Sequence, residues 1–234
     1  MPSQTTTDNT SILVLGASGQ TGLVLSRHLA NHPSKPSIHA FCRSPEKMDP
    51  KDHRLFASAI KGDARKPEDL ERALRESRAD YVIVTLGYGL VVSKSKNTIR
   101  TESAQALVPI LRKPEFQHVR TIVISSTGAG NSKIIYGLTG RLVAAYIRHV
   151  IRDHTGQEEA FKKIANRTEV IRLTGLHDDE PTGKLVTFAD REPHPNITTQ
   201  RADLAAWVVD TVTSGRPFGG HTINATSANA SATQ

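Results

Sequence analysis

Short apolar runs alternate with longer amphipathic stretches along most of the chain. The apolar runs are too short for helices and are bounded by turn or polar residues, a pattern that is typical of buried parallel strands. We therefore predict strands at residues 12–15, 37–41, 55–61, 81–86, 121–125, 169–172 and 221–224.

The stretches between these runs carry apolar residues at helical spacing. One of them begins with Pro67 and two carboxylates, which suit the first turn of a helix. A loop rich in acids, proline and glycine is expected to reach residue 184, and Asp203 is expected to cap the last helix. We predict one helix that starts at residue 66 and further helices at residues 21–29, 98–112, 141–163 and 203–213.

The alternation of strands and helices predicts an α/β fold. Parallel neighbours need crossover connections, so we expect one doubly wound, Rossmann-like sheet with helices on both faces. No repeat or linker divides the chain. The sequence predicts one domain at residues 11–225, with a substrate region in its last third, between a flexible tail at 1–10 and a disordered polar tail at 226–234.

Three glycines follow the first predicted strand at intervals of three residues. Gly16 allows a tight turn, Gly19 allows the backbone to approach a pyrophosphate, and Gly22 allows the next helix to pack close to the sheet. The free N–H groups of that helix would point at the anion. Because strand, turn and helix occur in this order, the motif favours dinucleotide binding over a purely steric glycine turn.

The end of the second predicted strand indicates which dinucleotide is bound. Enzymes of this fold that bind NAD carry a carboxylate there, whereas this chain has Arg43 followed by Ser44. A guanidinium suits a ribose 2′-phosphate, and Lys47 is a candidate second cation. We therefore expect a preference for NADP(H), the alternative being that Arg43 is an ordinary solvated arginine.

Composition narrows the range of partners and compartments. The formal charge of +7 favours anionic partners, but the basic residues are dispersed and only 5% of residues are aromatic, so nucleic-acid binding is not expected. The single cysteine, Cys42, excludes an internal disulfide, and no Cys/His cluster has metal-ligand spacing. The polar start of the chain and the absence of long apolar runs predict a cytoplasmic protein without a membrane segment.

The motifs together resemble one family. The Gly16-x-x-Gly19-x-x-Gly22 turn, Arg43, Gly62-Asp63 and the segment Arg201-Ala202-Asp203-Leu204-Ala205 look like the atypical short-chain dehydrogenase/reductases. The nearest branch resembles the NmrA-like and biliverdin reductase B (flavin reductase) group, over residues 11–225.

This resemblance implies a set of cofactor contacts. The glycine turn and the helix after it would hold the pyrophosphate, the second strand end the 2′-phosphate, the third strand end the adenine, and the fourth and fifth strand ends the ribose and nicotinamide. Asp63 has an alternative reading as a simple turn residue. With Gly22, Ser44 and Ser125, which are predicted from the turn and the strand ends themselves, the candidate cofactor residues are Gly16, Ser18, Gly19, Gln20, Thr21, Gly22, Arg43, Ser44, Asp63, Ala64, Leu86, Gly87 and Ser125.

The catalytic residues depart from the pattern of short-chain dehydrogenases, which use a serine and Tyr-x-x-x-Lys. Tyr136 is followed four positions later by Gly140, and Tyr146 by Val150, so neither tyrosine has its lysine. Simple ketone reduction is thus disfavoured. A conjugated acceptor spreads the incoming charge and needs less acid assistance, so positioning over the nicotinamide would supply much of the rate.

Three residues are candidates for catalysis: Ser126, Tyr136 and His154. Ser126 would contact the substrate or the carboxamide, unless it only terminates the strand. His154 would protonate the acceptor, because imidazole titrates near neutrality, unless it belongs to a solvated helix face. His177 is a further candidate for the pocket wall.

The sequence leaves three functions open. The first is an NADPH-dependent oxidoreductase that transfers hydride to a flavin, a quinone or a secondary metabolite. The second is a non-catalytic NADP-sensing regulator, and the third a redox-neutral isomerase or dehydratase. In each case we expect a small-molecule ligand and a monomer or homodimer.

Overall fold

The structure is a computed structural model that describes residues 10–88, 97–133, 137–190, 192–193 and 195–229. Apart from Thr10, the predicted N-terminal tail lies outside these residues, and so does Tyr136. Within the described residues, every helix is too short or too polar to span a lipid bilayer.

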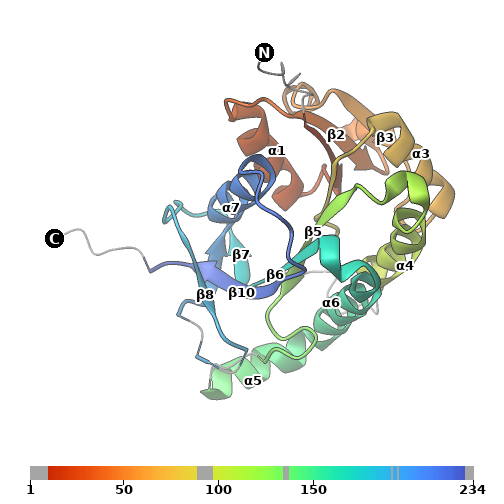
Figure 1. Cartoon of the computed structure of the whole chain (residues 1–234). Coiled ribbons are helices and arrows are strands. Elements are labelled where there is room, and N and C mark those ends of the chain that lie inside the picture. The colour runs from red at the N-terminus through yellow and green to blue at the C-terminus, as the bar shows by residue number, and fades with distance from the viewer. Residues whose placement is uncertain (1–9, 89–96, 134–136, 191, 194, 230–234) are drawn as a thin grey trace, which may run out of the picture.

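An eight-stranded sheet forms the centre of the molecule, in the order β3-β2-β1-β4-β5-β6-β10-β8 (Figure 1). Its strands pair in parallel, except that β8 runs antiparallel to β10. The strands are β1 (Ser11–Leu15), β2 (Ser37–Cys42), β3 (Ser58–Lys61), β4 (Tyr81–Val84), β5 (Arg120–Ser126), β6 (Thr168–Leu173), β8 (Leu185–Phe188) and β10 (Thr222–Ser227). The predicted doubly wound α/β fold is confirmed.

Helices cover both faces of this sheet. Apolar side chains of α1 and α7 pack in the core on one face, and those of α3, α4 and α6 pack in the core on the other. Figure 1 shows α1 beside α7, and α4 beside α6. The helices are α1 (Gln20–Asn31), α2 (Pro50–His53), α3 (Pro67–Ser77), α4 (Ile99–Leu111), α5 (Gly137–Tyr146), α6 (Arg148–Phe161) and α7 (Arg201–Thr213).

The strand order reverses beside β1. The chain passes from β1 outward to β2 and β3, then returns to place β4 on the other side of β1. Crevices for ligands form at such a point, outside the carboxyl ends of the strands. The topology therefore predicts a ligand site at the carboxyl ends of β1, β2 and β4.

Several elements differ from the sequence prediction. The single helix predicted at 141–163 is two helices, because Ile147, with φ −93° and ψ 13°, interrupts it. The third strand begins at Ser58 because the residues before it form α2 and a turn. The predicted loop before residue 184 contains β7 (Gly175–His177), which pairs with β9 (Thr198–Gln200).

The predicted C-terminal tail overlaps the last strand of the sheet. Thr226 and Ser227 belong to β10 and are fully buried. Their hydroxyls have partners: that of Thr226 donates to the carbonyl of Thr198, and that of Ser227 donates to the Asp203 carboxylate. Polar residues can thus be buried in this strand because each finds a hydrogen bond, which composition did not reveal.

Asp203 does not cap α7, which has Gln200 at its N-cap. Its carboxylate accepts hydrogen bonds from Ser227, from the N–H and hydroxyl of Thr182 and from the N–H of Gly183. Burial alone would raise the pKa of Asp203, but these hydrogen bonds hold it below its usual value. Asp203 therefore ties the loop before β8 to the last strand of the sheet.

Candidate functional site

The glycine turn after β1 forms one wall of the site. Gly16 has φ +88°, which favours glycine, and a Cβ there would lie 3.0 Å from the Thr85 hydroxyl. A Cβ on Gly22 would clash with the Gly16 carbonyl oxygen and with Ala17. Helix α1 therefore begins directly against the turn, with Gly19 as N-cap and no acidic residue in its first turn. Its positive end remains available to an anion.

A cleft lies beside this turn, at the carboxyl ends of β1, β2, β3 and β4. The structure brings eight of the thirteen predicted cofactor residues together in its wall: Gly16, Ser18, Gly19, Arg43, Asp63, Ala64, Leu86 and Gly87. Sequence reasoning did not assign a cofactor contact to the other wall residues, which are Phe41, Cys42, Gly62, Thr85, Tyr88 and Ile99.

One end of the cleft is polar and partly aromatic. The Arg43 guanidinium carbon lies 6.0 Å from the centre of the Tyr88 ring. Nearby, Arg65 donates to both oxygens of Asp63, with Nη2 at 2.6 Å from Oδ2. These hydrogen bonds lower the pKa of Asp63 to about 2, so its carboxylate is ionised at neutral pH. The one sequence signal that could have placed Tyr88 in the cleft wall is its position just beyond the fourth strand.

A second hollow adjoins the cleft and shares Ser18 and Arg43 with it. Ser44 and Lys47 also line this hollow, so two cations and two hydroxyls face it. Two carboxylates lie in its wall as well, and both have partners. Asp52 is paired with Arg27 at 2.6 Å, and Asp49 accepts the N–H of Lys51 at 2.8 Å.

Arg201 reaches the first turn of α1 from the start of α7. Its Nε lies 3.3 Å from the Thr21 hydroxyl and its Nη2 lies 3.2 Å from the Gln20 side-chain oxygen. Its Nη1 pairs with Asp178 at 2.9 Å, and only 13% of the side chain is exposed. Sequence reasoning used Arg201 as a family motif but gave it no site role, because the motif does not show which helix end it approaches.

Ser125, a predicted cofactor residue, takes part in a buried polar network. It is buried at the end of β5, and its hydroxyl donates to Glu158 at 2.6 Å. Glu158 also pairs with Arg172 at 2.8 Å, and both side chains are almost completely buried. A buried ion pair needs further hydrogen bonds to be satisfied. Ser125 therefore supports this pair and is not part of the described cleft wall.

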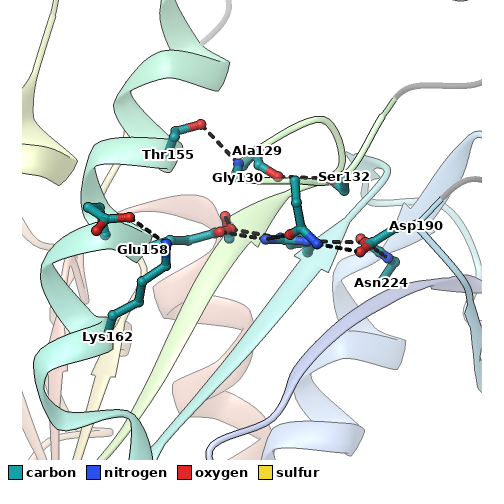
Figure 2. A network of polar contacts seen from close by, with 12 residues as sticks. Ala129, Gly130, Ser132, Thr155, Glu158, Lys162, Asp190 and Asn224 are labelled. Carbon is teal, nitrogen blue, oxygen red and sulfur yellow. Dashed lines mark hydrogen bonds and ion pairs between the residues drawn. The ribbon is translucent and has the colours of Figure 1, made fainter.

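The network around Arg172 continues toward the loop after β8. Arg172 donates to Asn131 at 2.9 Å and pairs with Asp190 at 3.2 Å. Asp190 also accepts hydrogen bonds from Asn131 and from Asn224, each through an amide nitrogen. Figure 2 shows this network running from Glu158 on α6 to Asp190 and Asn224. It joins α6, β6, β10 and two loops into one polar layer.

Two of the three catalytic candidates fall within the described residues. Ser126 is half-buried, and its hydroxyl donates to the neighbouring carbonyl of Thr127 at 3.1 Å. His154 is only 7% exposed, and burial together with the charge of Arg100 lowers its pKa well below the usual value. The imidazole is therefore neutral, and His154 is not on the solvated helix face that was the alternative. His177 is exposed on β7.

Comparison with known proteins agrees with the geometry of the glycine turn. A family model described as NAD(P)H-binding matches residues 16–215. A search of curated protein sequences gave no match.

Solved structures share the fold. A wide-type short-chain dehydrogenase/reductase from Veillonella parvula, in complex with NADP, is 17% identical, with a TM-score of 0.73 over 94% of this chain and 96% of that chain. ChuY, an anaerobillin reductase from Escherichia coli O157:H7, is 18% identical, with a TM-score of 0.70 over 94% and 98%. A putative NAD-dependent epimerase/dehydratase from Bacillus halodurans is 20% identical, with a TM-score of 0.72 over 94% of each chain.

Proposed function

The chain belongs to the NAD(P)H-binding family, and from this premise we propose that it is an NADPH-dependent reductase of a conjugated or aromatic small molecule. The observation that carries the proposal is the pair of adjoining hollows that share Arg43 and Ser18. The cleft beside the glycine turn suits the adenosine and its pyrophosphate, and the adjoining hollow presents Arg43, Ser44 and Lys47 to a 2′-phosphate.

The residues present fit a dinucleotide. A side chain at Gly16 or Gly22 would obstruct the turn, so the backbone there is open to a phosphate. The first turn of α1, with Gln20 and Thr21, would hold the pyrophosphate, and Arg201 adds a cation beside it. Asp63 and Ala64 would contact the adenine, and Leu86 and Gly87 would border the ribose.

When bound, the reduced coenzyme supplies a hydride. The chain's own task is to orient the acceptor and to accommodate the negative charge that the acceptor gains. Ser126, at the end of β5, is the proposed contact for the acceptor or the carboxamide. Because the described histidine candidate is buried and neutral, we assign the proton to solvent. That assignment suits an acceptor that delocalises charge.

A regulator that binds NADP without turnover is the second candidate. It is favoured by the state of the two described candidates: the Ser126 hydroxyl bonds to local backbone and His154 is buried. Gly140 and Val150 stand where a catalytic lysine would follow Tyr136 and Tyr146, and this absence of lysine also favours a regulator without turnover. A redox-neutral isomerase or dehydratase would use the same coenzyme site as a scaffold.

The test uses the full chain with NADPH and either FMN or menadione. A reductase is expected to cause loss of the absorbance of reduced nicotinamide only when an acceptor is present, and NADPH without acceptor is the control. Binding of NADPH, measured by calorimetry, without acceptor-dependent oxidation would support the regulator. No binding of NADPH or NADH would remove both candidates.

A further inference from the structure

Buried polar atoms without partners gather between α4 and α6. Nε of Arg100, Nδ1 of His154 and both amide atoms of Gln157 are closed to solvent and have no well-aligned hydrogen-bond partner in the described structure. The Gln157 side chain lies close enough to the His154 ring to act on its pKa, which it raises against the effect of burial. Gln157 is 0% exposed and His154 7%. Leaving a buried polar group unpaired is costly, because the group loses its hydrogen bonds to water and gains none in return. Several such atoms in one place indicate that a polar partner binds there. We refer to Arg100, His154 and Gln157 as the α4–α6 polar cluster.

Arg100, the member of this cluster on α4, adjoins the coenzyme cleft. Gly87 and Ile99 both line the cleft, and Arg100 follows Ile99 in the first turn of α4. A Cβ built on Gly87 would lie 2.5 Å from Nη2 of Arg100, so the guanidinium lies directly against Gly87. The close approach of the two helices depends on Gly156, where a Cβ would clash with the Thr101 side chain.

The charges in this region leave Arg100 incompletely paired. Its one ion pair in the described structure, Nη1 to Asp153, is long at 3.3 Å. The Asp153 carboxylate also accepts the backbone N–H groups of Arg100 and Thr101, at 3.2 and 2.8 Å, so it mainly holds the first turn of α4. On α6, Glu158 is engaged with Arg172.

The protonation of the cluster follows from its burial. Burial lowers the pKa of the Arg100 guanidinium, which remains charged because arginine titrates far above neutrality. Burial and the charge of Arg100 keep His154 neutral. The cluster thus presents one poorly solvated cation on α4, and the amide nitrogen of Gln157 on α6 is a donor without a hydrogen-bond partner. A guanidinium in this state is best matched by a carboxylate.

We propose that the α4–α6 polar cluster binds a carboxylate group of the hydride acceptor, with Arg100 and Gln157 as the donors. The proposal rests on the proposed reductase function for the identity of the ligand. It narrows the acceptor to a conjugated molecule that carries an acidic group, whose ring would extend from Gly87 over the cleft. Arg100 and Gln157 then determine specificity and take no part in hydride transfer.

The test compares two probes that differ only in charge, 2-naphthoate and 2-naphthamide, on the full chain saturated with NADP⁺. Calorimetry is expected to show the naphthoate binding about tenfold tighter or more, since a charge-assisted hydrogen bond contributes about 1.5–3 kcal/mol. Arg100→Met is expected to abolish this preference, and Arg100→Lys to restore part of it. Arg152→Met is the matched control, because Arg152 is exposed and immediately precedes Asp153 on α6.

Gln157→Leu provides a second, independent variant. Removing two unpaired amide atoms is expected to maintain or raise the midpoint of thermal unfolding, while naphthoate binding weakens. Weaker binding in a protein of undiminished stability cannot come from unfolding. Unchanged naphthoate binding would show that the amide is unrelated to ligand recognition and would overturn its assigned role.

Because binding is measured without turnover, the two proposals fail separately. A preference for naphthoate that depends on Arg100, in a protein that never oxidises NADPH, supports the cluster and removes the reductase. Acceptor-dependent oxidation with equal binding of both probes supports the reductase and overturns the cluster. An equal loss of preference in Arg152→Met and Arg100→Met would also overturn it, since general charge would then explain the effect.

Discussion

Two arginines lie near the glycine turn, and each is placed by a different part of the chain. Arg43 follows β2 and borders both hollows, whereas Arg201 begins α7 and contacts the first turn of α1. Under the proposed function they meet different phosphates. Arg43 faces the group that distinguishes NADPH from NADH, and Arg201 lies beside the pyrophosphate that both coenzymes share.

Arg43→Ala is expected to weaken NADPH binding about tenfold to a hundredfold and NADH binding little, because it removes a charge-assisted contact of about 1.5–3 kcal/mol from the 2′-phosphate. Calorimetry with both coenzymes measures the two effects. Arg54→Ala, at an exposed arginine after α2, is the control. Equal weakening of both coenzymes would contradict the 2′-phosphate assignment.

Arg201→Ala is expected to weaken NADPH and NADH equally, by about tenfold, because the loss affects the shared pyrophosphate. Asp178→Asn serves as the opposite test. It frees the guanidinium from its 2.9 Å ion pair and should tighten both coenzymes. If Arg201→Ala weakened the binding of NADPH and not of NADH, the assignment of Arg201 to the pyrophosphate would be contradicted.

At the scale of elements, the buried pair of Glu158 and Arg172 connects α6 to β6. Their side chains are 6% and 5% exposed, so neither charge can be solvated if its partner is removed. The periodicity of α6 indicated a helix but could not show which acidic residue turns inward. Glu158 and Glu159 are neighbours in sequence, yet Glu159 is largely exposed and pairs with Lys162 on the surface.

Glu158→Ala is expected to lower the free energy of unfolding by about 3–5 kcal/mol, because Arg172 would lose its buried partner and keep only the longer ion pair with the more exposed Asp190. Glu159→Ala, the matched control, should change it by less than about 1 kcal/mol. Urea denaturation followed by circular dichroism gives both values. A similar small effect in both variants would mean that water reaches Arg172.

At the scale of the whole molecule, the last strand closes the sheet against loops from distant parts of the chain. β10 pairs with β6 and β8, and its final residues bond to Asp203 and to the backbone near β9. The hydroxyls of Thr174 and Thr226 also share a hydrogen bond, which joins two segments that are 52 residues apart along the sequence. The end of the described chain is therefore a structural element.

Removing all residues from Thr226 onward is expected to lower the midpoint of thermal unfolding by about 6–12 °C, for a loss of about 3 kcal/mol in buried hydrogen bonds. A chain that ends after Asn229 keeps β10 and should unfold at the original midpoint. Differential scanning calorimetry compares the two. Equal midpoints would show that the end of β10 contributes nothing to stability.

The local pattern of the sequence was sufficient for the central sheet, for most helix positions and for the glycine turn. These features depend on spacing between near neighbours: apolar runs for parallel strands, periodicity for helices, and glycines where a Cβ would clash. The place of Arg43 also followed, because a strand end in a known topology has a defined location. The NAD(P)H-binding family model over residues 16–215 agrees with the predicted nucleotide-binding fold.

Only the tertiary structure decided which side chains meet. The Ser125 hydroxyl donates to Glu158, and the His154 side chain is buried. Arg201 contacts the first turn of α1, although its motif lies far along the sequence. Such pairings depend on how whole elements pack, and a buried charge selects its partner from distant segments. Local spacing carries no information about these pairings. The glycine turn could therefore be predicted from the sequence, whereas the surroundings of the catalytic candidates could not.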